Sequence, residues 1–230
     1  MRRVLVMLLA MLALPAAAQS PVVVELFTSQ GCSSCPPADD LLRDLVRDPK
    51  LRGKVIPLAF HVDYWNHLGW SDPFSSKKWS ARQFSYGRAF KLNGAYTPQM
   101  VVDGQTQFVG SNAGALHAAI EQASKRKRDA KVALRIDGAD VVVNATATGQ
   151  ADLIVVAFEN GVATKIERGE NGGRTQVSDA IVRDLRVLGP IKGGREDRLA
   201  LDLRPSMGVA ALVQDRATMR IEAAAVAYAR

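Results

Sequence analysis

The chain contains only two cysteines, Cys32 and Cys35, separated by two residues. They follow a β-branched run at residues 22–28 and precede Pro36 and Pro37, which open a stretch with helical apolar spacing. On a first helical turn this spacing brings two sulfurs within disulfide reach, with the first exposed and the second turned inward. The pair therefore predicts a redox dithiol at a strand-to-helix junction, in which Cys32 attacks and Cys35 resolves.

The expected helix start favours the thiolate of Cys32. Backbone N–H groups without partners and the positive end of the helix dipole both stabilise negative charge there. Pro36 and Pro37 fit the first turn, where the missing N–H groups would have no helical acceptor. Asp39 and Asp40 also suit a helix start, but their charges oppose a nearby thiolate.

Other functions fit a C-x-x-C pair. It can form a static disulfide, or half of a structural zinc site, for which only three histidines are present to complete four ligands. A metal chaperone is a further alternative, because the two thiolates with His61 or His67 suit copper or zinc. We favour redox chemistry from the strand-to-helix context and assign no metal ligand. We expect His61 and Asp63 to order a loop through hydrogen bonds.

Aromatic residues are concentrated just after the second apolar run, although aromatic residues make up only 6% of the chain. The concentration comprises Tyr64, Trp65, Trp70, Phe74 and Trp79. Large rings of this kind line grooves for extended partners, and they also dominate hydrophobic cores. We assign Tyr64 and Trp65 to substrate binding, with core packing as the alternative.

The first half of the chain alternates strand-like and helix-like patterns. Asp103-Gly104 between two short apolar runs is a strong hairpin signal. We expect strands at residues 22–28, 54–62, 99–102 and 105–109, and helices at residues 36–47, 75–92 and 111–128. The dithiol then lies beyond the carboxyl end of a strand, where open α/β sheets place their sites.

These features resemble the active site of thioredoxin-like proteins, which combine a C-x-x-C pair with a Thr-Pro ahead of a strand. The resemblance implies an α/β thioredoxin-like fold and a cis bond before Pro98, beside the dithiol. It also implies that Thr97 offers its backbone to an extended substrate. Three stretches look like a bacterial family of secreted thioredoxin-like proteins classed as a domain of unknown function: His61-Val62-Asp63-Tyr64-Trp65-Asn66, Gly69-Trp70-Ser71-Asp72-Pro73-Phe74 and Tyr96-Thr97-Pro98-Gln99.

The first eighteen residues have the pattern of a secretory signal peptide. Arg2 and Arg3 precede an apolar run at residues 4–14, and small residues lead to a cleavage site after Ala18. An uncleaved anchor is the alternative, but the run is too short to span a bilayer. We therefore expect a periplasmic or secreted protein, in an oxidising compartment where C-x-x-C pairs make, reduce or shuffle disulfides.

The formal net charge of +7 does not predict a nucleic-acid partner. Much of the basic surplus lies in residues 125–128, Lys-Arg-Lys-Arg, at the end of a predicted helix. Cations there complement the helix dipole, and no aromatic residues interleave with them as in nucleic-acid sites. Beyond the leader, no run approaches eighteen apolar residues, so we expect no stable membrane span.

After Asp129 the pattern changes to short β-rich runs separated by turn residues. We expect seven or eight strands, drawn from residues 131–136, 140–147, 152–159, 162–167, 175–188, 198–203, 208–214 and 219–228. A helix at residues 176–188 is an alternative, and residues 169–174 resemble a flexible loop. Strands at this spacing predict an all-β, sandwich-like domain that supports the protein or recognises a partner.

The sequence thus predicts a signal peptide at residues 1–18, a thioredoxin-like domain at residues 19–129 and a β-sandwich-like domain at residues 130–230. The predicted function is thiol–disulfide exchange with a protein, peptide or small-molecule disulfide. No dissociable cofactor is needed, because the dithiol carries the two electrons, but a second thiol system must recharge it. A thioredoxin-like binding module without turnover is the remaining alternative.

Overall fold

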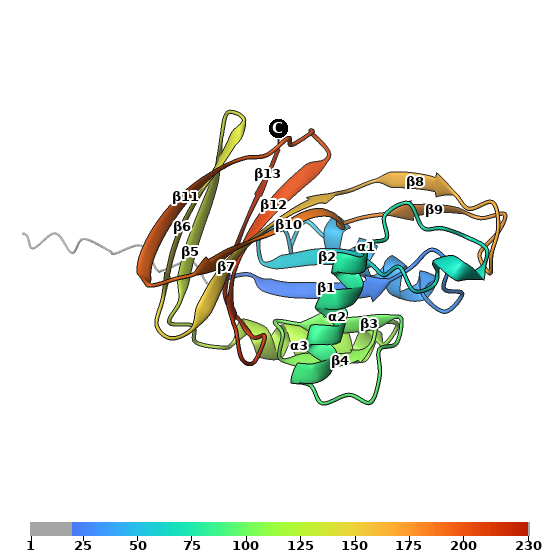
Figure 1. Cartoon of the computed structure of the whole chain (residues 1–230), viewed down its shortest axis with the longest axis horizontal. Helices are drawn as coiled ribbons and strands as arrows, with labels where there is room; N and C mark the ends of the chain where they lie inside the picture. The colour runs from blue at the N-terminus through green and yellow to red at the C-terminus, as the bar shows by residue number, and fades with distance from the viewer. Residues whose placement is uncertain (1–19, 230) are drawn as a thin grey trace, which may run out of the picture.

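The computed structural model describes residues 20–229, so the predicted signal peptide lies outside the described residues. The first half alternates strands and helices (Figure 1). Its elements are β1 (Val22–Thr28), α1 (Pro36–Arg47), β2 (Val55–His61), the 3-10 helix η1 (Asn66–Leu68), α2 (Lys77–Ala89), β3 (Gln99–Val102), β4 (Thr106–Val109) and α3 (Ala113–Ser124). The predicted order of elements in this half is confirmed.

The ends of these elements follow local chemistry. β1 and β2 are buried along their whole length, as continuous apolar runs predict for parallel strands. Helix α2 begins after Ser76, whose side chain accepts from the backbone N–H of Lys78. Helix α3 is capped by Asn112, one residue later than the predicted start. Two of the helices are therefore shorter than expected.

The second half consists of strands. They are β5 (Lys131–Asp137), β6 (Asp140–Ala147), β7 (Ala151–Glu159), β8 (Val162–Lys165), β9 (Thr175–Ser178), β10 (Ile181–Pro190), β11 (Gly193–Ala200), β12 (Met207–Asp215) and β13 (Ile221–Tyr228). Ala180, with a positive φ of 56°, lies in the break between β9 and β10. The alternative of a helix at residues 176–188 is therefore wrong.

Strands from both halves form one mixed sheet of eight strands, in the order β13-β12-β7-β10-β2-β1-β3-β4. β10 joins β2 through a parallel bridge between Ile181 and Ala59, and the Ala59 N–H donates to the Ala180 carbonyl at 2.7 Å. The predicted fold class, an α/β thioredoxin-like domain followed by an all-β sandwich, is therefore wrong. β7 and β12 are buried almost throughout, as strands inside a sheet covered on both faces are.

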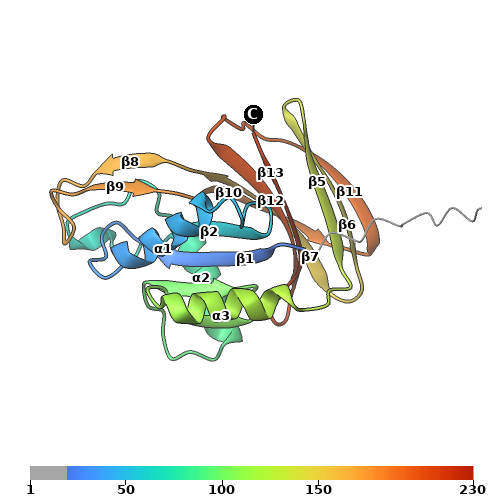
Figure 2. The same cartoon turned by 180° about the vertical axis from the view of Figure 1, so that it is seen from behind.

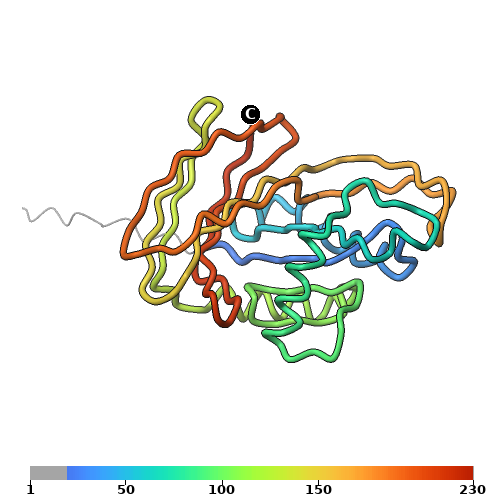
Figure 3. Tube along the Cα trace, viewed as in Figure 1, coloured from blue at the N-terminus to red at the C-terminus, as the bar shows by residue number. Residues whose placement is uncertain are grey.

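The remaining strands form two small sheets. β11, β6 and β5 make a three-stranded sheet, which packs on β7, β12 and β13 through a second apolar cluster that includes Val143, Leu153 and Val209. β8 and β9 make a two-stranded hairpin, which projects along α1 toward the carboxyl end of β1 (Figures 1 and 3). The hairpin thereby brings residues of the second half to the end of the sheet where Cys32 lies.

The helices cover both faces of the sheet's first half. α1 and α3 lie on one face and α2 on the other (Figures 1 and 2). Phe27 and Phe60 pack beneath α2, with ring centroids 5.4 Å apart, and Trp79 of α2 closes on Phe60. Within residues 20–229 there is no helix with the length and apolar character needed to cross a bilayer.

A buried polar network connects α2 to the second half of the chain. Glu25, in the middle of β1, is fully buried and accepts from Arg82 Nε at 2.7 Å and from the Tyr86 hydroxyl. Gln214 of β12 donates to the Tyr86 hydroxyl at 3.0 Å and accepts from Arg82 at 3.1 Å. A buried charge needs such partners, so this network fixes α2 against both strands.

Candidate functional site around Cys32 and Cys35

Cys32 and Cys35 form a disulfide at the start of α1, with their Cα atoms 5.5 Å apart. Cys35 is the N-cap of the helix, and its N–H donates to the Cys32 carbonyl at 3.2 Å. Both residues are fully buried, at 0% exposure. The expected inward position of Cys35 is confirmed, but the expectation of an exposed Cys32 is wrong.

The sulfur of Cys32 lies between two hydroxyl groups. Thr97 Oγ1 donates to Cys32 Sγ at 3.4 Å, and Ser34 Oγ is also 3.4 Å from that sulfur. Trp65 Nε1 donates to Thr97 Oγ1 at 2.8 Å, which orients the hydroxyl proton toward the sulfur. The Thr97-Pro98 bond is cis, as the motif resemblance implies. The structure therefore brings Thr97, Pro98 and Trp65 to the cysteine pair.

The aromatic residues divide between the site and the core. Tyr64 is half-buried, donates to Gln83 of α2 at 3.1 Å, and has its ring 6.4 Å from both Trp65 and Phe84. Phe84 is 45% exposed, so this group reaches the surface. Trp79 is buried in the core, where the alternative of core packing is confirmed.

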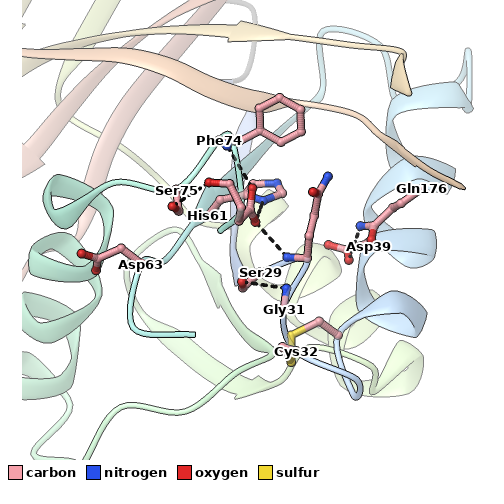
Figure 4. Close-up of polar contacts among 12 residues, drawn as sticks. Ser29, Gly31, Cys32, Asp39, His61, Asp63, Phe74, Ser75 and Gln176 are labelled. Carbon is pink, nitrogen blue, oxygen red and sulfur yellow. Dashed lines mark hydrogen bonds and ion pairs between the residues drawn. A yellow bond between two sulfur atoms is a disulfide. The ribbon is translucent and has the colours of Figure 1, made fainter. Parts of the chain in front are cut away.

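A buried histidine and carboxylate pair supports the turn before Cys32 (Figure 4). His61 Nδ1 lies 2.7 Å from Asp72 Oδ2, and the same oxygen accepts from the Gln30 N–H at 2.8 Å. Burial alone would lower the pKa of His61, but the Asp72 carboxylate raises it. Burial would raise the pKa of Asp72, but His61 holds it below its ordinary value. The expectation that His61 orders a loop through hydrogen bonds is confirmed.

His67, the other candidate metal ligand, is exposed in η1. Over residues 20–229 no group of three or more His, Cys, Asp and Glu side chains is arranged to hold a metal ion. Both cysteine sulfurs are engaged in the disulfide.

Asp39 is a further acidic group beside the site, one helical turn after Cys35. Burial raises its pKa to about 6, against the opposing influence of His61, which favours the ionised form. Asp39 Oδ2 accepts from Gln176 Nε2 of β9 at 3.0 Å (Figure 4). Residues four apart on a helix share a face, so Asp39 and Cys35 lie on the same side of α1.

The tip of the β8–β9 hairpin, residues 166–174, holds the turn that carries Cys32. Asn171 is only 2% exposed, and its Nδ2 donates to the carbonyl oxygens of Gln30 and Cys32, both at 2.9 Å. Glu170 accepts from the Ser33 N–H at 3.0 Å. Residues 169–174 form a turn, as predicted, and they bring the second half, to which we assigned support or partner recognition, into contact with the turn that carries Cys32. The glycines of this turn predict a bend in the chain, but they do not predict that the turn contacts the segment around Cys32.

Comparisons with known proteins show which family and which solved structures the chain is similar to. It is similar to a solved structure, protein AGR_C_4864 from Agrobacterium tumefaciens, with 30% identity, a TM-score of 0.77 and coverage of 94% of this chain and 97% of that one. It also shares a fold with HBP35 of Porphyromonas gingivalis, with 16% identity, a TM-score of 0.61 and coverage of 92% of this chain and 76% of that one. None of the curated proteins compared with the chain matches it. The model of a family described as "Protein of unknown function (DUF1223)" matches residues 23–214, and the chain belongs to that family.

Proposed function

We propose that this protein is a thiol–disulfide oxidoreductase that acts through Cys32 and Cys35. The observation that carries the proposal is the disulfide at the start of α1, with the Thr97 hydroxyl directed at Cys32 Sγ. A hydrogen bond to sulfur favours its thiolate, as does the N-terminus of a helix. The C-x-x-C and cis Thr-Pro motifs, which resemble those of thioredoxin-like proteins, support the same proposal.

The reaction is a reversible exchange of two electrons. In the reduced protein, the Cys32 thiolate attacks one sulfur of a substrate disulfide, forming a mixed disulfide and releasing the other sulfur as a thiolate. Cys35, deprotonated, then attacks Cys32 Sγ, which restores the Cys32–Cys35 disulfide and releases the second substrate thiolate. The protein dithiol is oxidised and the substrate disulfide is reduced to two thiols.

The substrate class is a protein, peptide or small molecule that carries a disulfide, and a second thiol system restores the reduced pair. We assign substrate binding to the half-buried Trp65 and Tyr64 and to Thr97 and Pro98. The dithiol itself carries the electrons, so the reaction requires no dissociable cofactor. The leader-like pattern at residues 1–18 supports a periplasmic or secreted location.

Trapping the mixed disulfide tests the proposal. Cys35→Ser leaves the attacking sulfur and removes the resolving one. The reduced variant should therefore accumulate a mixed disulfide with insulin or with a disulfide-bonded peptide. Cys32→Ser is the matched control and should accumulate none. The wild-type protein should in addition accelerate the reduction of insulin by dithiothreitol.

The outcome that refutes the proposal is equally specific. If wild-type protein neither accelerates insulin reduction nor oxidises a dithiol peptide, and Cys35→Ser forms no adduct, the pair is a static disulfide. The adducts are measured by mass spectrometry of the acid-quenched, intact protein.

A further inference from the structure

The buried state of the cysteine pair conflicts with the geometry that exchange demands. An attacking thiolate must reach Cys32 Sγ directly, and the rate of exchange depends on that access. Yet Cys32 and Cys35 both have 0% exposure, while their neighbours Ser33 and Ser34 are exposed. The disulfide is therefore shielded from solvent although the two residues between the cysteines are exposed.

Two segments enclose the turn at residues 30–33. The hairpin tip, residues 166–174, contributes the hydrogen bonds of Asn171 and Glu170 to its backbone. The loop after β2 contributes Trp65, which approaches Gly31 so closely that a Cβ there would lie 3.2 Å from the Trp65 Cβ. The segments meet each other, because a Cβ on Gly169 would lie 3.0 Å from the Trp70 Cβ.

The hairpin is held mainly by polar contacts. Ile166 is the one apolar side chain in residues 162–178 that is buried. Its attachments to α1 are polar. Arg43 donates to the Val177 carbonyl at 2.6 Å, and Gln176 donates to Asp39 at 3.0 Å. Arg43 and Arg47 also form ion pairs with Asp179, directly after β9. Segments with few buried apolar contacts and exposed backbone open locally at lower free energy than the core.

We infer that the hairpin tip, residues 166–174, holds the turn at residues 30–33 closed over the Cys32–Cys35 disulfide, fastened by Asn171 and Glu170, and that this cover must lift before Cys32 Sγ reacts. This inference rests on the proposed function and adds the step that controls it. Opening replaces three hydrogen bonds between the tip and the turn with hydrogen bonds to water. A substrate disulfide exchanges with the cysteine pair only if it displaces the tip or binds after the tip has opened.

Reduction of the disulfide by a small reductant tests the cover without any protein substrate. Attack of a dithiothreitol thiolate on Cys32 Sγ releases the Cys35 thiolate. The second dithiothreitol thiol then closes the oxidised ring and frees Cys32. We expect Asn171→Ala to be reduced about tenfold faster than wild type or more, because two hydrogen bonds that exist only in the closed state are lost. Glu170→Ala should be reduced a few-fold faster.

Two controls make the result specific. Arg174→Ala changes an exposed side chain of the same tip that makes no hydrogen bond or ion pair in residues 20–229, and it should be reduced at the wild-type rate. Glu170→Gln keeps an acceptor for the Ser33 N–H, and its rate should lie nearer wild type than that of Glu170→Ala. Thermal unfolding of each oxidised variant shows that the core is intact.

Equal reduction rates for wild type, Asn171→Ala and Glu170→Ala, all with intact cores, would overturn the cover. That result would stand even if the protein exchanged disulfides with insulin. Conversely, faster reduction of Asn171→Ala by dithiothreitol, with no exchange toward any protein or peptide disulfide, would uphold the cover and refute the oxidoreductase function.

Discussion

Asp39→Asn should remove a loss of stability that the wild-type protein undergoes as the pH rises from about 4 to about 6. The carboxyl titrates near 3.8 in the unfolded chain and at about 6 in the folded protein. Between these values the folded state binds more protons than the unfolded state, so the free energy of unfolding falls as the pH rises. An uncharged amide at this position cannot ionise, and its oxygen still accepts from Gln176.

The size of the effect follows from the difference between the two pKa values. About two pKa units correspond to about 3 kcal/mol, and partial access of solvent to the carboxyl lowers the expected change to ~2 kcal/mol. His61 has a raised pKa, so it adds stability below pH 6.5 that is lost as the pH rises through its folded value. That titration is present in both proteins, and only the smaller part of the His61 shift that the Asp39 charge causes differs between them.

Urea unfolding of the oxidised proteins at pH 4, 5, 6 and 7 measures the effect. Relative to wild type, Asp39→Asn should gain ~2 kcal/mol between pH 4 and pH 7 and change little above pH 7. Asp44→Asn, which alters an exposed carboxyl of the same helix, is the control. A difference between wild type and Asp39→Asn that stays constant over this range would refute the placement of Asp39 in a desolvated site.

Three further substitutions test other parts of the structure. Arg82→Met leaves Glu25 buried without its cation and should cost about 3–5 kcal/mol of unfolding free energy in urea titrations, of which the double variant with Glu25→Leu should recover part. Thr97→Val removes the hydroxyl that donates to Cys32 and should raise the pKa of the reduced Cys32 thiol, measured from alkylation rates against pH. Gly104→Ala should cost about 2–4 kcal/mol in the same titrations, because φ is +64° and a Cβ would overlap the backbone of the β12–β13 turn. An unchanged stability or thiol pKa in any of these variants would contradict the contact or the backbone geometry on which its prediction rests.

The elements of the first half follow from local patterns. The apolar run at residues 22–28 predicts β1, and the two prolines after the cysteines predict the start of α1. The structure has both elements at these positions. The Asp103-Gly104 hairpin is equally local, with both residues at positive φ. His61 at a strand end indicates a hydrogen-bonded loop, and Asp72, eleven positions later, supplies the partner.

The arrangement of the halves depends on contacts that no local pattern encodes. β10 joins β2 at a single residue pair, which leaves no periodic trace in the sequence. Asn171 contacts Cys32 across 139 positions of chain, from a turn whose glycines predict a bend and not its destination. The continuous apolar character of β7 and β12 indicates strands inside a sheet that is covered on both faces. Strands of a sandwich would instead alternate apolar and polar residues.

The equilibrium reduction potential of the Cys32–Cys35 pair tests the central claim most directly. It is measured by titrating the purified protein against defined ratios of reduced and oxidised dithiothreitol or glutathione and trapping free thiols for mass spectrometry. An exchanging pair should titrate within the range of dithiol oxidoreductases, about −270 to −120 mV. A pair that stays oxidised below about −300 mV would be a structural disulfide and would contradict the account.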